Sequence, residues 1–450
     1  MVKMRCMECS FETLMPRKLT LSRSCYVNIV FIFITAKEVT KILLNPLFLA
    51  IIMFSGLDLY ACPIFFHAYQ LDRNIGKENI QRNTLSFYVL DAANKTWHRQ
   101  PLQINAVDKF GNIDFDSKFH GPEFELNHFD RLAIAKNSLT TTRWKKSKNK
   151  PCDSKKVYEI SISGKYGYIF QCKKALEPES YLIDYDEKNR TVFSPRYTYI
   201  HDDSNHLSFT KIKFKQKKKS IQDLVAFDAE QLIFADVKNF FSMSFRADDV
   251  SATLQKKIDG QLGMIGLLQF YLRILFFKIE LALTPEVQFY EESIFMPMSL
   301  FSPVDAKKYL NEGSGIFYSW KSPEDIKWFP SQKNIPFYAG KSKFHKMDKT
   351  YCRGRRCFFE LTGLVGEEMV TLSFSIDRSL ANLNFYPQFI TDFSGVNKIY
   401  DRKISKSPEK RMGVFFETSS LPEGNHYWDF WITFSQNLRG CQLRPRIVKL

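Results

Sequence analysis

Two histidines, His201 and His206, flank the densest polar cluster in the sequence, and Asp203 lies between them. Strand-like segments on both sides make residues 202–205 a four-residue turn, so the histidines are near cross-strand neighbours. The Cβ atoms of such neighbours lie about 5 Å apart, and imidazole nitrogens with a carboxylate at that spacing can hold a divalent metal ion. Asp, Ser and Asn also favour turns for their own reasons. A polar hairpin tip is therefore the competing interpretation of this metal-site candidate.

Lysines concentrate in two short tracts that could bind anions. The anion-binding candidates are Lys145, Lys146, Lys148, Lys217, Lys218 and Lys219. Trp144 adjoins the first tract and Phe214 lies beside the second, and an aromatic ring next to cations can add stacking to charge. The whole chain has a formal net charge of +16, which favours anionic partners. No nucleic-acid-binding motif accompanies the tracts, so envelope polyanions or carbohydrate, with peripheral membrane association, and a plain solvated surface are the interpretations that we keep.

The common catalytic motifs are missing from the sequence. It has no G-x-x-x-x-G-K phosphate loop, no G-x-S-x-G nucleophile and no H-E-x-x-H zinc pair. Paired acids such as Glu291 and Glu292 are too common to assign as a general acid and base. Trp428 and Trp431 could stack on a sugar, but a strand places residues three apart on opposite faces, so at most one is exposed. The sequence therefore names no catalytic residue and no cofactor beyond the candidate metal ion.

The cysteines predict a disulfide framework. Beyond residue 61 the sequence has an even number of them, namely Cys62, Cys152, Cys172, Cys352, Cys357 and Cys441. The second and third flank two strand-like segments joined by a Gly-containing turn, which predicts a bridged hairpin. Cys352 and Cys357 would close a tight turn, and Cys62 is left for Cys441. An oxidising compartment permits all three bridges.

The expected compartment follows from an apolar segment near the N-terminus. Residues 42–56 are uncharged, a run shorter than the ~20 residues that a membrane-spanning helix needs. Lys37 and Lys41 precede it and Ala61 follows it, which is the pattern of a cleaved signal peptide. The segment also resembles a lipobox ending at Cys62, so a lipoprotein is the alternative. We expect export to the periplasm or outer envelope, with translation starting downstream of the first residue.

The remaining elements are mostly strands. Short segments rich in β-branched and aromatic residues, separated by turn residues, predict antiparallel sheets and sandwiches with a few helices. Residues 262–283 are interrupted by charges and alternate with a period of two, which indicates core strands rather than a membrane span. Residues 248–263 are expected to form a helix that begins at an Asp cap and ends near Gly260.

The predicted organisation has four parts. Residues 1–61 form an N-terminal extension with the signal peptide, and 62–215 form a β-rich domain. Residues 221–345 form a mixed β/α middle region, and 346–450 form a sandwich in which an immunoglobulin-like arrangement is suspected.

One stretch resembles a known group of proteins. Trp97, Pro101, Gln103, Asn105 and Asp108, with a glycine three positions further on, follow a W-x3-P-x-Q-[IV]-[DN]-x2-D-x2-G pattern, and a D-R-L sequence comes later. The pattern is similar to that of uncharacterised exported proteins of Gram-negative bacteria. The resemblance implies export and a β-rich first domain, and it implies no activity.

These observations lead to one expected function and two alternatives. We expect an exported, envelope-associated binding or scaffolding protein with a basic surface, and not an enzyme. The first alternative is a secreted hydrolase that acts on envelope polysaccharide, which would need two carboxyl groups about 5–10 Å apart in a cleft. The second is an exported protein that binds a divalent metal ion.

Overall fold

The protein is described by a computed structural model that covers most of residues 63–450. The residues left out of the description are 1–62, 74, 76–78, 92, 94, 109–112, 116–123, 136–137, 146–148, 175–180, 203–205, 207–208, 215–228, 240, 247–248, 275–276, 281–285, 303, 322–326, 331–344, 347–350, 366–367, 384, 391–410 and 435–444. The described chain is mainly β, as predicted, and its strand pairs are antiparallel. Its helices are short, and among the described residues none is long and apolar enough to cross a membrane.

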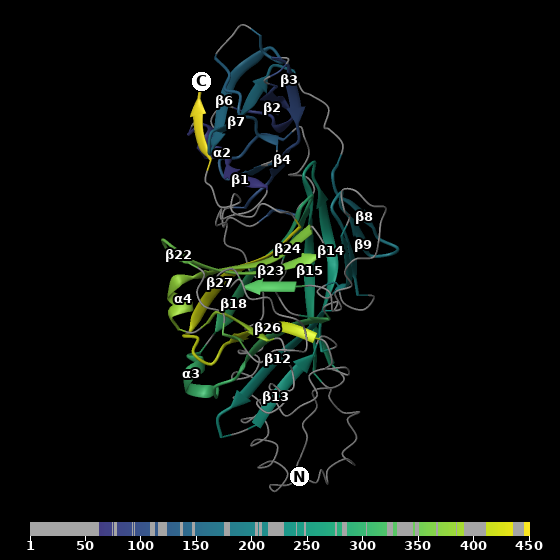
Figure 1. Cartoon of the computed structure of the whole chain (residues 1–450), viewed down its shortest axis with the longest axis vertical. Helices are drawn as coiled ribbons and strands as arrows, with labels where there is room; N and C mark the ends of the chain where they lie inside the picture. Colours follow the sequence, from purple (N-terminus) through teal and green to yellow (C-terminus); the bar gives the residue numbers. More distant parts are fainter. Residues whose placement is uncertain are drawn as a thin grey trace, which may run out of the picture.

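Two sheets form the N-terminal unit, at the top of Figure 1. The three-stranded sheet has the order β1 (Ile64–His67), β5 (Arg131–Ile134), β4 (Leu102–Asn105). The five-stranded sheet has the order β28 (Arg446–Lys449), β6 (Ser154–Ile162), β7 (Lys165–Cys172), β2 (Leu85–Leu90), β3 (Trp97–Gln100). Alternating apolar residues of both sheets, with those of the short helix α2 (Ala68–Leu71) and the 3-10 turn η3 (Arg82–Thr84), face a shared core in which Phe66, Phe87 and Ile160 are fully buried.

The last strand returns to this unit. β28 pairs with β6, so the end of the chain lies in the same sheet as residues from its first third. The backbone N–H of Leu450 donates to the carbonyl of Val157. Lys449 and Lys156 both form ion pairs with Asp72, which follows α2. Backbone pairing and charge together hold the C-terminal strand in place.

The rest of the described chain is a large sandwich below this unit (Figure 1). One sheet has the order β14 (Val250–Asp259), β15 (Gly263–Ile274), β17 (Glu286–Tyr290), β18 (Ser293–Ser302), β27 (Gly424–Thr433), β24 (Glu368–Asp377), β23 (Arg356–Val365), β20 (Lys327–Pro330), with β16 (Phe277–Glu280) on β15 and β22 (Tyr351–Arg353) on β23. The facing sheet has the order β13 (Phe241–Arg246), β12 (Ala229–Val237), β19 (Gly315–Lys321), β26 (Arg411–Glu417), β25 (Pro387–Ile390), β21 (His345–Lys346). The helices α3 (Ala306–Tyr309) and α4 (Arg378–Asn382) lie at its margin.

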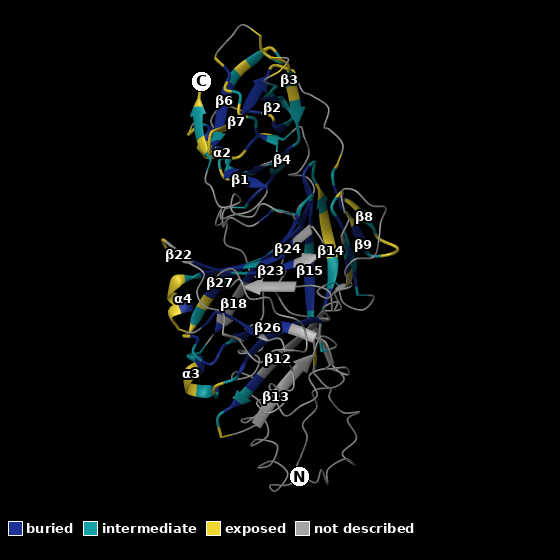
Figure 2. Cartoon of the chain, in the orientation of Figure 1, coloured by how far each residue is buried: buried dark blue, intermediate teal, exposed yellow. Residues whose placement is uncertain are grey.

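A small third sheet completes the sandwich core. It has the order β11 (Phe209–Phe214), β10 (Tyr197–His201), β9 (Thr191–Phe193), β8 (Asp184–Asp186). Val192, Tyr197, Tyr199 and Ile212 belong to the same buried cluster as the side chains between the two large sheets. Figure 2 shows this burial as dark blue along the strands, with exposed residues at turns and helices.

Two expectations need correction. Residues 248–263 do not form a helix, because β14 pairs with β15 along its length and turns back at Gln261–Leu262. This segment satisfies its hydrogen bonds across the sheet, and long-range pairing overrides the local helix signal. An immunoglobulin-like sandwich of residues 346–450 is not confirmed either, because the strands of that segment are distributed over three different sheets.

The two disulfides within the described residues are confirmed. Cys152 and Cys172 join the open end of the β6–β7 hairpin with their Cα atoms 5.8 Å apart. The hairpin turns at Ser163 and Gly164, both with positive φ, as a two-residue hairpin turn requires. Cys352 and Cys357 are paired residues of β22 and β23, with Cα atoms 4.0 Å apart. The predicted third pair lies outside the described residues.

Two of the residues that carry the resemblance, Gln103 and Asn105, lie where the N-terminal unit meets the ten-stranded sheet. The Gln103 Oε1 atom accepts hydrogen bonds from the backbone N–H groups of Leu262 (3.2 Å) and Gly263 (2.9 Å). Its Nε2 atom donates to Asn105 Oδ1 at 3.1 Å. A Cβ atom on Gly260 would lie 2.2 Å from the Gln103 side chain, so a larger residue there would displace the Gln103 amide from these hydrogen bonds. In the described chain, Gln103 and Asn105 therefore lie at an interdomain contact.

Candidate functional site

The first lysine tract belongs to a loop that the sequence anchors at its start. We call residues 143–150 the basic loop; residues 146–148 are outside the description. Trp144 is buried, its ring packs edge-on against Trp97 at 5.6 Å, and its backbone N–H donates to the Tyr168 hydroxyl at 2.7 Å. Phe170 packs against the same rings. The large apolar side chain within a basic stretch thus fixes the loop to the sheet.

The far end of the basic loop is fixed as well. The Trp97 indole N–H donates to the carbonyl oxygen of Asn149 at 3.0 Å. Two residues after Lys150, the Cys152–Cys172 disulfide ties the chain to the end of β7. Loops that are held by a rigid scaffold are typical positions for binding residues.

Arg143 is held by its own partner at the base of the loop. Its side chain is 61% exposed, and its Nε and Nη2 atoms donate to the two carboxylate oxygens of Glu159 at 3.1 and 2.9 Å. This hydrogen bond and the charge of Glu159 raise the pKa of the Arg143 guanidinium. The Tyr168 hydroxyl donates to the same carboxylate at 3.3 Å, and burial raises the Tyr168 pKa to about 12, so this donor stays protonated.

The side chains of Lys145 and Lys150 are exposed to solvent. Because Glu159 neutralises Arg143, these lysines carry the net positive charge of the described part of the loop. The predicted anion-binding residues Lys146, Lys148, Lys217, Lys218 and Lys219 lie outside the described residues. Glu159 was missed at the sequence level because it is an ordinary strand residue. Trp97 was singled out only for the resemblance, and its role as an anchor was not predicted because it is separated from the loop in the chain.

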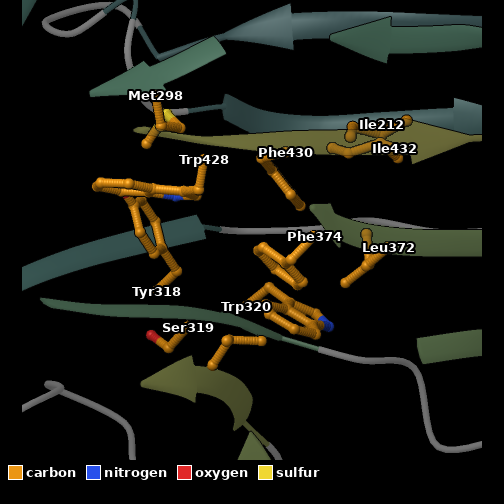
Figure 3. Close-up of a pocket in the computed structure, with 11 residues that line it drawn as sticks. Ile212, Met298, Tyr318, Ser319, Trp320, Leu372, Phe374, Trp428, Phe430 and Ile432 are labelled. Atoms are coloured by element: carbon orange, nitrogen blue, oxygen red, sulfur yellow. The ribbon is translucent and has the colours of Figure 1, made fainter. Parts of the chain in front are cut away.

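A second candidate is an apolar pocket between the two large sheets. It encloses about 60 Å³, and Figure 3 shows side chains of both sheets pointing into it. Its lining is Ile212, Met298, Tyr318, Ser319, Trp320, Leu372, Phe374, Val414, Trp428, Phe430 and Ile432. An engineered apolar cavity that binds benzene has about 150 Å³, so this pocket is too small for a sugar ring or a drug-sized ligand. It is a gap in the packing of the core.

The tryptophans considered for sugar stacking are both part of buried cores. Trp428 lines the apolar pocket, whereas Trp431 stacks on Phe295 with ring centroids 3.9 Å apart. They point to opposite faces of β27, as their spacing predicts. Their exposed fractions are 1% and 4%, so neither offers a surface to a sugar.

The predicted histidine pair comes together at the edge of the small sheet. The ring centroids of His201 and His206 lie 5.0 Å apart, and His201 Nδ1 lies 2.9 Å from the His206 carbonyl oxygen. Burial lowers the pKa of His201 to about 3, and that of His206 is lowered by burial and by the charge of Arg190. Neutral imidazoles suit a metal ion, but the same Arg190 charge opposes one. Asp203 lies outside the described residues.

The described residues offer no cluster of three or more His, Cys, Asp or Glu side chains suited to a metal ion. Carboxyl groups with raised pKa values occur, and all of them are buried. Burial raises the pKa of Glu286 to about 7 and that of Asp429 to about 6. Arg356 forms an ion pair with Asp429 at 3.3 Å.

Comparison with known proteins adds little to this geometry. No family model matches the sequence, and no curated protein matches it. Among solved structures, the chain is similar to an alpha-mannosidase from Enterococcus faecalis V583, with a TM-score of 0.40, 9% identity and coverage of 95% of this chain and 50% of the other. The chain is also similar to a protein in the glycosyl hydrolase family 38 from Enterococcus faecalis. The TM-score is 0.40 and the identity is 8%, with coverage of 94% of this chain and 52% of the other.

The Slr1438 protein from Synechocystis sp. PCC 6803 has a TM-score of 0.26 and 8% identity, with coverage of 59% of this chain and 99% of the other. This chain spans about half the length of each of the two Enterococcus proteins. At these TM-scores and identities, the likenesses define neither a family nor a function for the chain.

Proposed function

We propose that this protein is an exported, non-catalytic binding protein of the bacterial envelope, and that the basic loop binds an anionic polymer. The observation that carries the proposal is the anchoring of that loop at both ends. Trp144 and the Trp97–Asn149 hydrogen bond fix its backbone, and the Cys152–Cys172 disulfide ties the chain that follows it to the end of β7. Exposed Lys145 and Lys150 are thereby presented to a partner from a rigid sheet.

The compartment is supported independently of the loop. Two disulfides indicate an oxidising, non-cytoplasmic location. The periplasm or the outer envelope is our proposal within that location, and the resemblance to exported proteins points the same way. Cleavage after Ala61 and lipidation of Cys62 remain the two alternatives for the N-terminus.

The hydrolase alternative is less well supported by the described residues. Its best acid would be Glu286, because a carboxyl pKa near 7 suits a general acid. However, its two oxygens accept hydrogen bonds from Ile113 N–H (3.3 Å) and Gln288 Nε2 (2.6 Å), and the side chain is 1% exposed. A group held in this way does not reach a polysaccharide.

A charge-matched pair of variants tests the proposal. We expect Lys145→Gln with Lys150→Gln to weaken binding to purified lipopolysaccharide at least about tenfold, since a lysine near an anionic surface contributes about 1 kcal/mol. The control is Lys307→Gln with Lys308→Gln on α3, which removes the same charge from exposed positions in the sandwich. Equal losses in both variants would show that total charge, and not the basic loop, determines binding. Isothermal titration calorimetry measures both.

A further inference from the structure

A row of polar side chains crosses the three-stranded sheet of the N-terminal unit. In the strand register, His67 of β1 and Asn105 of β4 are both direct partners of Arg131 on β5. Directly paired residues of antiparallel strands point to the same face, with Cβ atoms about 5 Å apart. The face in question is turned toward the ten-stranded sheet, because Arg131 Nη2 lies 3.9 Å from Glu286 Oε2 on β17.

Burial deepens along this row. His67 is half-buried and sits at the rim, where its ring stacks on the exposed ring of Tyr69 and its Nδ1 atom lies 3.0 Å from the carbonyl oxygen of Phe129. The Arg131 side chain is 12% exposed, and Asn105 is 1% exposed. The row therefore leads from the surface into the contact between the N-terminal unit and the sandwich.

The buried end of the row has hydrogen-bond donors that the described residues do not satisfy. Arg131 Nε, Arg131 Nη2 and Asn105 Nδ2 are inaccessible and have no hydrogen-bond acceptor among them. The 3.9 Å separation from Glu286 is an ion pair without a hydrogen bond. Leaving such donors unpaired costs about 1–3 kcal/mol each. All of these groups donate, so the missing partner is an acceptor.

We propose that Arg131 and Asn105 bind one small carboxylate at this junction, with His67 at its entrance. A guanidinium is the side chain best suited to a carboxylate, because two of its N–H groups can meet the two oxygens. Asn105 supplies a further donor from the next strand. The carboxylate can belong to a free small acid or to an acidic sugar, and the small acid is the better fit because the donor atoms are inaccessible and Asn105 is 1% exposed.

The ionisation of Glu286 should make anion binding at this site depend on pH. An anion beside Arg131 faces the Glu286 carboxyl group, so the two negative charges compete unless Glu286 takes up a proton. Its pKa of about 7 results from burial, opposed by Arg131 and by hydrogen bonds, and raised slightly by Asp108. Binding should therefore weaken as the pH rises above 7, by up to about tenfold per unit.

The experiment uses the full chain and three probes: acetate, glucuronate and, as the neutral control, glucose. Isothermal titration calorimetry at about pH 6 and about pH 8, where both carboxylates stay ionised, should show binding of the acids and none of glucose. Tighter binding of glucuronate would identify the sugar as the source, and equal binding would identify the carboxylate alone. Both results support the site.

Variants separate the groups. Arg131→Lys keeps the positive charge but loses the paired N–H groups of the guanidinium, so it should weaken binding of the acids at least about tenfold. Glu286→Gln, which copies the protonated acid, should tighten binding at about pH 8 and flatten the pH dependence. His67→Gln should leave the dependence near pH 7 in place. Lys145→Gln with Lys150→Gln should leave the affinity for both acids and its pH dependence unchanged, which distinguishes this site from the basic loop.

Two outcomes would overturn the proposal. If neither acid binds at about pH 6, the donors are satisfied by water. If Glu286→Gln, folded as judged by circular dichroism, binds no more tightly than the unaltered protein at about pH 8, the anion does not lie next to Glu286.

Discussion

Three arginine–carboxylate pairs in the N-terminal unit and its junction differ in how well they are satisfied. Arg82 and Asp130 are both buried, with donor–acceptor distances of 3.1 and 2.9 Å. Arg143 and Glu159 make two hydrogen bonds, and the arginine is exposed. Arg131, whose side chain is 12% exposed, and buried Glu286 lie 3.9 Å apart, without a hydrogen bond. The first pair stabilises the fold, the second fixes the base of a loop, and the third has donors left for a ligand.

Breaking the Arg82–Asp130 ion pair should have the largest effect on stability. Asp130→Asn leaves the buried guanidinium of Arg82 without its counter-charge, which should lower the free energy of unfolding by about 3–5 kcal/mol. The control is Asp153→Asn, because Asp153 pairs with Lys173 at 2.7 Å in an ion pair whose side chains are both more than half exposed. That change should cost less than about 1 kcal/mol. Urea denaturation measures both, and equal costs would contradict the ranking.

Removing the Cys152–Cys172 disulfide beside the basic loop should have the second largest effect on stability. Cys152→Ser with Cys172→Ser opens a loop of 20 residues, for which chain entropy predicts a loss of about 3 kcal/mol. The equivalent change at Cys352 and Cys357 opens only 5 residues and should cost about 2 kcal/mol. Thermal unfolding of the two double variants tests the order. The first should also weaken lipopolysaccharide binding, and the second should not.

The histidine pair gives a pH effect of intermediate size. The pKa of His201 is about 3 in the folded protein, against about 6.5 when unfolded, so acid protonates the unfolded chain first. Stability is present above about pH 6.5 and should fall by about 2 kcal/mol between pH 7 and pH 5. Urea denaturation across this range measures it. His201→Phe should remove most of the slope, and an unchanged slope would place the effect elsewhere.

The third pair should show the smallest effect on stability, with the opposite pH dependence. The pKa of Glu286 is raised in the folded protein, so its contribution is favourable below about pH 4.5 and is lost as the pH rises through about 7. Glu286→Gln should therefore stabilise the protein, and by about 1 kcal/mol more at pH 8 than at pH 6. Thermal unfolding at the two pH values is the measurement. A loss as large as that of Asp130→Asn would mean that the third pair is structural.

Sequence and structure agree where the signal is local. The cysteine spacings predict both described disulfides, because a hairpin and a tight turn bring their own ends together. Residues 262–283 contain strands as predicted, but the alternation after Arg273 does not belong to one strand, because β15 turns back to pair with β16. Residues 248–263 show the limit, since the partner that makes β14 a strand is β15, and only the sheet decides between helix and strand.

The candidate sites are long-range, and this is why they were only partly predicted. The lysines of the basic loop are visible as a charge run, but its anchors are Trp97 and Glu159, which ordinary strand patterns do not mark. Arg131 and Glu286 are separated by more than 150 residues in the sequence. Their chemistry arises from the meeting of two sheets, and no spacing along the chain reports it.

The central claim, that the basic loop makes this protein a polyanion-binding protein, is tested most directly by salt dependence. Binding to dextran sulfate and to neutral dextran should be measured while salt rises from about 0.01 M to about 0.15 M, which shortens the screening length from about 30 Å to about 8 Å. We predict binding of the sulfated polymer alone, weakening steadily with salt and lost first in the Lys145→Gln, Lys150→Gln variant. Equal binding of both polymers, or binding that does not respond to salt, would contradict the claim.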